Sequence, residues 1–165
     1  MENMVFVQNA STGIMAVLRS LKFNEDDTIL MTSETYNTVE MAVKDVCRTA
    51  GSKIQSLNLS YRTADCHAEE GYFIEDIVCQ FKEYLSNNVG VKLAVIDYIG
   101  SSNAVLYPVK ELVDLCHQYN VAVLIDGAHA PGQVPLNLEE LGADFFVGKV
   151  LTYLIKQPRS VRMRT

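Results

Sequence analysis

The stretch Val123-Leu-Ile-Asp126-Gly-Ala-His129-Ala-Pro-Gly-Gln133 decides the fold of this chain. It begins with the apolar composition of a buried strand, and the strand ends in a carboxylate, a glycine and an imidazole. Polar side chains that follow a buried strand lie at the carboxyl end of a sheet, where the ligands of α/β proteins collect. The stretch therefore predicts a pocket with Asp126 and His129 on its wall.

Short runs with strand character recur along the chain, and most of them are continuously apolar instead of alternating. They cover residues 28–31, 53–57, 93–96, 121–125 and 144–147. Apolar residues at helical spacing lie between them, at 14–21, 39–50, 74–85 and 109–116, and Pro108 is expected in the first turn of the last helix. The pattern predicts an α/β fold with three layers, in which right-handed crossovers place helices on both faces of a mostly parallel sheet.

The composition is typical of one globular domain. With 165 residues, 48% of them hydrophobic and 21% charged, the chain can bury a core. No apolar run approaches the roughly 18 residues that a membrane span needs, and the acidic start lacks the basic region of a signal peptide. We expect a cytoplasmic protein that does not associate with membranes.

Charge is distributed unevenly between the body of the chain and its end. Residues 149–165 contain five basic residues and no acidic ones, so residues 1–148 are strongly acidic. An acidic body does not attract nucleic acid, and we expect no such partner. We expect residues 1–148 to form the domain and residues 149–165 to form a divergent basic tail.

The cysteines give no sign of a metal site or a disulfide. Cys47, Cys66, Cys79 and Cys116 are scattered without a CxxC pair, which favours buried thiols. Cys66 stands beside His67, but the surrounding residues are polar, so a surface loop is favoured over a catalytic Cys-His pair.

Two aspartates are expected at one edge of the sheet. Asp97 and Asp126 each follow an apolar strand directly, so both face the crevice at the strand ends. Either residue alone could cap a turn or a helix. A cap does not require a histidine three residues later, so His129 favours a ligand site.

The first helix begins with small and hydroxylated residues. The N–H groups and hydroxyls of Ala10, Ser11 and Thr12 converge where the helix dipole favours an anion, which predicts a phosphate site. The alternative is an ordinary Ser or Thr cap that binds no ligand.

Four motifs, taken in order, resemble the class V aminotransferase family, whose members bind pyridoxal 5'-phosphate (PLP). They are Gln8-Asn-Ala-Ser-Thr-Gly-Ile14, Tyr36-Asn37, Asp97-Tyr-Ile-Gly-Ser-Ser102 and Asp126-Gly-Ala-His-Ala-Pro-Gly132. The similarity runs from about Phe6 to Gly148 and is strongest to the isopenicillin N epimerase-like branch, with cysteine desulfurases and kynureninases as relatives. It implies an incomplete large domain of the type I PLP-dependent transferase fold, and a homodimer.

The resemblance also assigns roles at the cofactor. Asp126 would keep the pyridine nitrogen protonated, which lets the ring accept electrons from a substrate carbanion. His129 would lie near the phenolic oxygen, and Ser101 or Ser102 would add a polar contact from the neighbouring strand end. Tyr36 would stack on the pyridine ring, although a tyrosine at a helix start is also common as a half-buried residue.

The resemblance breaks after Gly148. Thr152 stands where the family places the lysine that forms the Schiff base with the cofactor, and a hydroxyl cannot form an imine. Lys149 is a candidate substitute, but a shift of three residues along a strand moves a side chain by about 10 Å. We expect this chain to lack the Schiff-base lysine and to be a truncated form that is inactive alone.

Three functions remain open from the sequence. The first is a PLP-dependent enzyme that acts on an amino acid as an epimerase, desulfurase, lyase or aminotransferase. The second is a noncatalytic remnant that binds the cofactor or pairs with a full-length relative. The third is a generic α/β module in which Asp126 and His129 are structural.

Overall fold

The computed structural model describes residues 4–59 and 70–149, without the side chains of residues 70–74. Cys66, His67, Thr152 and the tail beyond residue 149 lie outside the described residues, so the expectations about them remain predictions.

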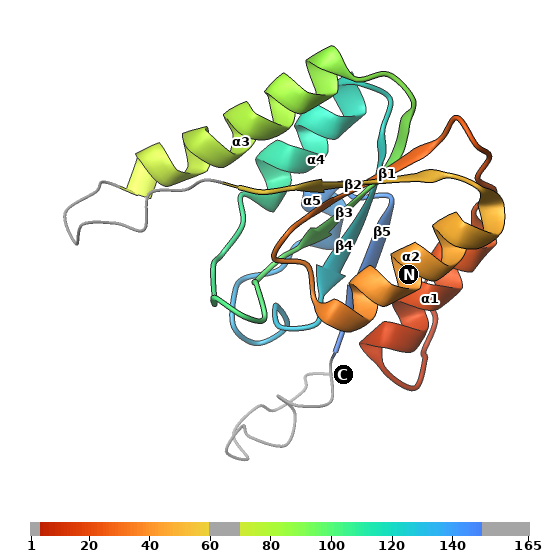
Figure 1. The fold of residues 1–165 in the computed structure, drawn as a ribbon. Helices are drawn as coiled ribbons and strands as arrows, with labels where there is room; N and C mark the ends of the chain where they lie inside the picture. The colour runs from red at the N-terminus through yellow and green to blue at the C-terminus, as the bar shows by residue number, and fades with distance from the viewer. Residues whose placement is uncertain (1–3, 60–69, 150–165) are drawn as a thin grey trace.

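The described residues form a parallel sheet in the order β2-β1-β3-β4-β5 (Figure 1). All four strand pairs in it are parallel, so the predicted parallel sheet is confirmed. The strands are β1 (Thr28–Thr32), β2 (Lys53–Leu57), β3 (Val91–Asp97), β4 (Ala122–Gly127) and β5 (Phe145–Gly148).

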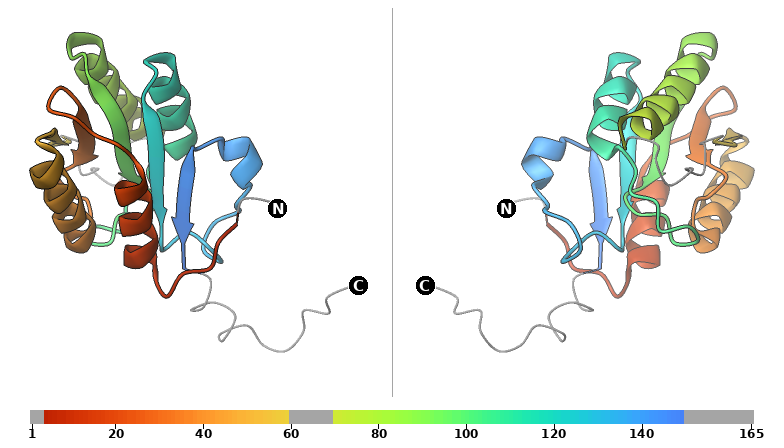
Figure 2. Two further views of the ribbon diagram at one scale, coloured as in Figure 1. Left: turned by 90° about the vertical axis from the view of Figure 1, so that its right-hand side faces the viewer. Right: turned by 90° about the vertical axis from the view of Figure 1, so that its left-hand side faces the viewer.

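Helices cover both faces of this sheet, which confirms the three layers (Figure 2). One face carries α1 (Ala10–Ser20) and α2 (Asn37–Ala50), and the other carries α3 (Glu70–Asn87), α4 (Val109–Gln118) and α5 (Leu138–Leu141). The periodic pattern did not predict α5, because its four residues are too few to show a helical repeat. Pro108 was expected in the first turn of α4 but is its N-cap residue.

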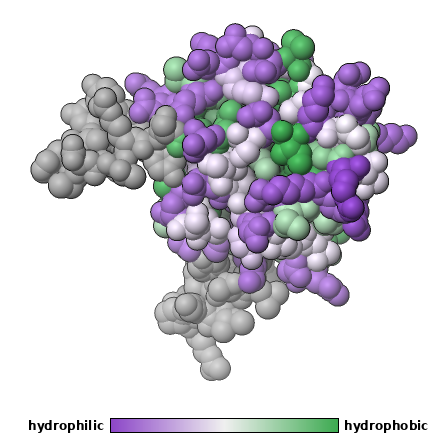
Figure 3. All heavy atoms as spheres, in the orientation of Figure 1, coloured by the Kyte–Doolittle hydropathy of each residue, from purple (hydrophilic) through white to green (hydrophobic). Residues whose placement is uncertain are grey.

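Alternate residues of the central strands build two separate cores. Leu93 and Leu124 pack towards α1 and α2, whereas Ala94 and Ile125 pack towards α3 and α4. All four side chains are fully buried, as expected for strands covered on both faces. The edge strand β2 is covered less completely than the central strands. The face of the molecule seen in Figure 3 is mostly hydrophilic, as two internal cores require.

The same alternation decides which strand-end side chains meet. Asp97 lies two residues after Val95, Asp126 lies two residues after Leu124, and Val95 and Leu124 both pack towards α1 and α2. Successive side chains of a strand point to opposite faces. Both aspartates therefore lie on the side of the sheet that α1 and α2 cover.

The prediction that the cysteines are buried is correct for Cys47 and Cys116 and wrong for Cys79, which is exposed. The buried residues Ile77 and Phe81 lie on one face of α3, and Cys79 lies half a turn away from that face. Among the described residues, no helix is long and apolar enough to cross a membrane.

Candidate functional site

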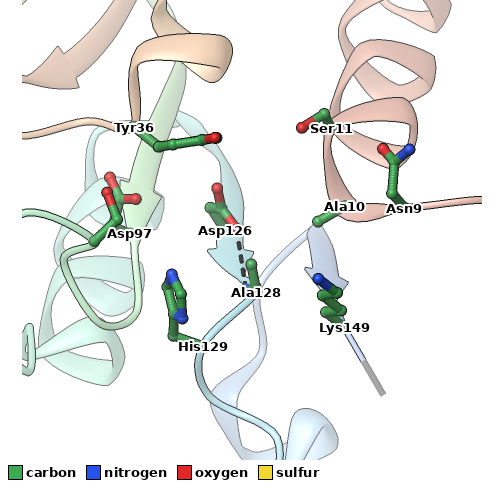
Figure 4. Close-up of a pocket in the computed structure, with 10 residues that line it drawn as sticks. Asn9, Ala10, Ser11, Tyr36, Asp97, Asp126, Ala128, His129 and Lys149 are labelled. Carbon is green, nitrogen blue, oxygen red and sulfur yellow. Dashed lines mark hydrogen bonds between the residues drawn. The ribbon is translucent and has the colours of Figure 1, made fainter. Parts of the chain in front are cut away.

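A cavity of about 420 Å³ opens at the carboxyl end of the sheet (Figure 4). The first residues of α1 form one wall, and the turns that follow β1, β3 and β4 form the others. The lining residues are Asn9, Ala10, Ser11, Tyr36, Asp97, Ser101, Asp126, Ala128, His129 and Lys149.

Most residues that the sequence assigned to a cofactor site meet in this cavity. Those that line it are Ala10, Ser11, Tyr36, Ser101, Asp126 and His129, together with the candidate Lys149. Thr12 does not line it. Ser102, the alternative to Ser101, is not among the lining residues and donates a hydrogen bond from Oγ to Glu34 Oε2 over 3.1 Å. The roles of these residues towards a ligand remain predictions.

The start of α1 is capped by a residue that the sequence analysis did not single out. Asn9 is the N-cap, and its Oδ1 accepts hydrogen bonds from the Thr12 N–H at 2.8 Å and the Thr12 hydroxyl at 3.1 Å. Ser11 and Thr12 are therefore not the caps that the alternative required. Asparagine is among the preferred N-cap residues, so its place before the helical pattern was an available signal.

Because the Asn9 side chain accepts from Thr12, two backbone donors at the start of α1 remain available to a ligand. The N–H groups of Ala10 and Ser11 donate to none of the residues that the structure describes. Both residues line the cavity, where the helix dipole adds partial positive charge. This wall is suited to an anion.

Asp126 forms a buried acidic part of the cavity. It is 6% exposed, and its Oδ1 accepts a hydrogen bond from the Ala128 N–H at 3.0 Å. Burial raises the pKa of this carboxyl group, while the Ala128 hydrogen bond and the charge of His129 act in the opposite direction. A cationic group of a ligand would favour the ionised form of this buried carboxyl group.

The backbone next to Asp126 has no room for a side chain. A Cβ on Gly127 would lie 2.1 Å from Cζ of Phe146, whose ring packs edge-on against Tyr98 at 6.4 Å between centroids. A glycine after the aspartate therefore lets β4 and β5 approach closely where the cavity begins.

Asp97 is the second buried acid of the cavity, and it is the register partner of Asp126 on the adjacent strand. It was predicted to face the crevice, and it does. Burial and the neighbouring charge of Asp126 raise the pKa of Asp97 to about 7, against the opposing effect of the nearby Tyr36 N–H and Thr35 hydroxyl. Its Oδ2 has no hydrogen-bond partner in the part of the chain that the structure describes.

Four further polar residues of the lining are exposed: Tyr36, Ser101, His129 and Lys149. The cavity therefore combines buried carboxyl groups with an accessible rim that carries basic side chains and helix N–H donors. Such a site suits a ligand with a cationic group at one end and an anionic group at the other. No group of three or more potential metal ligands occurs among the described residues.

Comparisons with known proteins identify the family. The family description Aminotransferase class-V matches residues 1–148. This chain belongs to the class V aminotransferase family. Its relatives include the L-cysteine desulfhydrase-like protein lolT2 of Epichloe uncinata, which is 31% identical over 87% of this chain and 30% of the relative. Putative L-cysteine desulfhydrase 1 of Oryza sativa subsp. japonica is 30% identical over 96% of this chain and 34% of the relative.

Solved structures share the fold. The cystine C-S lyase C-DES, in complex with its reaction product cysteine persulfide, superposes with a TM-score of 0.71 at 20% identity, over 85% of this chain and 35% of that protein. A cysteine desulfurase from Thermococcus onnurineus NA1 gives a TM-score of 0.65 at 20% identity, over 87% and 33% of the two chains. The chain thus spans about a third of the length of the curated relatives it matches.

Proposed function

We propose that this chain binds PLP in the described cavity and forms the cofactor-binding part of an enzyme that acts on an amino acid. One observation carries the proposal: residues from four separate sequence motifs line a single cavity. Family membership supports it, as does a C-DES variant of the same fold that was solved with glycine covalently linked to its PLP cofactor.

The side chains and backbone donors of the cavity match the two ends of PLP. Asp126 would hold the proton on the pyridine nitrogen, and the free N–H groups of Ala10 and Ser11 would bind the phosphate. The exposed ring of Tyr36 would cover the pyridine ring, and His129 would bond the phenolic oxygen. When bound, PLP supplies an electron sink for a carbanion at the substrate's α-carbon.

The substrate class follows from the relatives. Those described above are named cysteine desulfhydrases or desulfurases, or act on cystine, so we propose cysteine or a related amino acid for the whole protein. The isopenicillin N epimerase-like resemblance leaves an epimerase as the alternative reaction. We also propose that the chain works as a homodimer or with a full-length relative.

A noncatalytic role is the second candidate. Lys149 is the lysine that lines the cavity among the described residues, and it is exposed where it follows β5. With Thr152 at the position expected for the covalent lysine, the cofactor would bind reversibly and turnover by this chain would be absent.

Titration of the purified chain with PLP tests the proposal. We expect saturable binding by equilibrium dialysis, no absorbance of lysine-bound cofactor, and no lysine peptide labelled after borohydride reduction. Trapping at Lys149 would overturn the noncatalytic candidate in favour of an enzyme that uses this lysine.

Substitution of Asp126 by alanine provides the site-specific test. PLP affinity should fall by at least about tenfold, which is roughly 1.4 kcal/mol, because a buried charge partner is lost. Asp144→Asn is the matched control, since this aspartate lies before β5 at the opposite end of the sheet. Equal affinities in all three proteins would favour the generic α/β module.

A further inference from the structure

The pairing of Asp97 with Asp126 is a feature that the proposed cofactor contacts do not explain. The two residues are register partners at the carboxyl ends of adjacent parallel strands, and both lie on the face covered by α1 and α2. Neighbouring strands are about 4.8 Å apart, so the two carboxyl groups are close. They are 4% and 6% exposed, so water screens them poorly.

Two buried carboxylates on paired positions of adjacent strands favour a state in which one of them keeps a proton. The charge near each carboxyl group and its free oxygens indicate which one. Asp126 accepts the Ala128 N–H at 3.0 Å and lies near His129, whereas Asp97 keeps one carboxyl oxygen, Oδ2, without a partner among the described residues. Asp126 is thus the better carboxylate and Asp97 the better acid.

Asp97 also contacts the turn that delivers Tyr36 to the cavity. The Tyr36 N–H and the Thr35 hydroxyl lie near enough to its carboxyl group to lower its pKa, so β3 meets the connection between β1 and α2 at this point. The same connection is joined to the turn after β3 by Glu34, which accepts a hydrogen bond from Ser102 at 3.1 Å. Asp97 is therefore placed to fix the position of one cavity wall.

We propose that Asp97 is a positioning residue that keeps its proton in the resting protein: as a neutral acid it holds the Tyr36 turn and leaves Asp126 as the one buried negative charge of the cavity. A single carboxylate matches a single protonated ring nitrogen. This last consequence depends on the proposed function, whereas the protonation of Asp97 and its hold on the turn do not.

The other ionisable groups of the cavity do not neutralise the buried pair of acids in place of the proton on Asp97. Tyr36 from the start of α2, His129 from the turn after β4 and Lys149 after β5 are all exposed, so water screens their charges. Glu34 lies on the turn beside Tyr36, and α1 contributes no ionisable side chain to the lining.

Unfolding of Asp97→Asn across pH 4 to 9 tests the proton directly. The amide imitates the neutral acid at every pH. The pKa of Asp97 is about 7 in the folded wild type and about 4 in the unfolded chain, so between these pH values the folded state binds the proton more tightly. The unfolding free energy of the wild type therefore falls as pH rises from about 4 through about 7. The unfolding free energy of Asp97→Asn minus that of wild type should therefore increase over this pH range and remain constant above it.

The outcome that overturns the proposal is an Asp97→Asn protein whose unfolding free energy runs parallel to wild type between pH 4 and 8. Asp126→Asn is the matched variant, because it removes the neighbouring charge and keeps the size of the side chain. In that background, the window in which Asp97→Asn gains stability should move to lower pH. An unmoved window would contradict the coupling of the two acids.

Amide hydrogen exchange tests the hold on the turn without any ligand. Protection of the Tyr36 N–H should persist in Asp97→Asn and fall at least about tenfold in Asp97→Ala, a change of roughly 1.4 kcal/mol in local opening. Equal protection in both variants would show that Asp97 does not position the turn. If Asp97→Ala does not fold, Asp97→Asn still decides, because loss of Tyr36 protection in that variant refutes the hold.

PLP affinity at pH 6 connects this inference to the proposed function. Asp97→Asn should bind within about twofold of wild type, and Asp97→Ala about tenfold more weakly. A wild-type chain that does not bind PLP refutes the proposed function, while the unfolding and exchange measurements still decide the role of Asp97. Binding by wild type together with a tenfold loss in Asp97→Asn would refute the neutral acid.

Discussion

Aspartates lie at both ends of the sheet, and their pKa values are shifted in opposite directions at the two ends. At the amino end, Asp27 directly precedes β1 and Asp144 directly precedes β5. At the carboxyl end, Asp97 completes β3 and Asp126 lies one residue before the end of β4. The amino-end aspartates pair with basic side chains at 2.9 Å, whereas the carboxyl-end aspartates lie beside each other with the exposed His129 near Asp126.

At the amino end, the pKa of both aspartates is lowered. Lys92 Nζ lies 2.9 Å from Asp27 Oδ2, and this hydrogen bond is the main cause for Asp27. Burial opposes the ionisation of Asp144, but His117 at 2.9 Å and the Val123 N–H at 2.8 Å outweigh it. These charges stabilise the fold.

At the carboxyl end, burial raises the pKa of both Asp97 and Asp126. Neither lies near a buried cation in the part of the chain that the structure describes, and they face one cavity. Acids that oppose folding in this way are typical of sites where a ligand completes the charge balance. The comparison thus distinguishes aspartates that pair with cations from aspartates that face a cavity, without reference to any relative.

Gly127→Ala should produce the largest effect, because it disturbs the carboxyl end without changing a charge. The new Cβ would meet the Phe146 ring, with Cζ only 2.1 Å away, so the strands or the ring must shift. We expect a loss of about 2–3 kcal/mol in unfolding free energy by urea denaturation, as for overpacked cores. Phe146→Leu in the same chain should recover part of it, and additive losses would show that this contact is not the cause.

Asp126→Asn should separate stability from ligand binding. Removing one of two adjacent buried acids should raise the unfolding free energy at pH 8, because burial raises the pKa of Asp126 and a neutral amide has no charge to bury. PLP affinity should fall at least about tenfold. A variant that is less stable yet binds normally would break the distinction between the two ends.

The sheet and its two helical layers could be predicted because they depend on local periodicity. The apolar run at 93–96 lies within β3, and the helical spacing at 109–116 lies within α4. The place of Asp126 and His129 on the cavity wall could be predicted because both residues follow a recognisable strand. Burial of Cys79 was predicted wrongly because a helical pattern places a residue in a helix without fixing its face.

Features that depend on distant contacts could not be predicted. The approach of Phe146 to Gly127 and that of the Tyr36 turn to Asp97 join segments that are far apart in the chain. Asp97 was recognised as a crevice residue, but its protonation depends on Asp126 and on donors from another turn. The boundary at residue 148 and the role of Thr152 remain predictions.

Asp144→Asn should have a smaller effect than either change at the carboxyl end. The side chains of the His117–Asp144 pair are 42% and 41% exposed, so solvent screening limits the loss to less than about 1 kcal/mol at pH 7. Because the folded pKa of Asp144 is lowered, this stabilisation is present above about pH 4 and disappears as pH falls through the lower folded value. Thermal unfolding at pH 7 and pH 3 measures it, and a difference that grows towards pH 3 would contradict the assigned sign.

Lys92→Met should have the smallest effect. The Lys92 side chain is 42% exposed, and its ammonium group lies 2.9 Å from Asp27 and 5.7 Å from the centre of the Phe23 ring. Exposed ion pairs contribute about 0.2–1 kcal/mol, and salt reduces that contribution. The unfolding free energies of wild type and Lys92→Met should therefore converge in 1 M NaCl, while Lys92→Arg should stay close to wild type at low salt. Charge at the amino end acts only on the fold in this comparison, so PLP affinity should not change; an affinity that follows Lys92 would show that the two ends are coupled through β3.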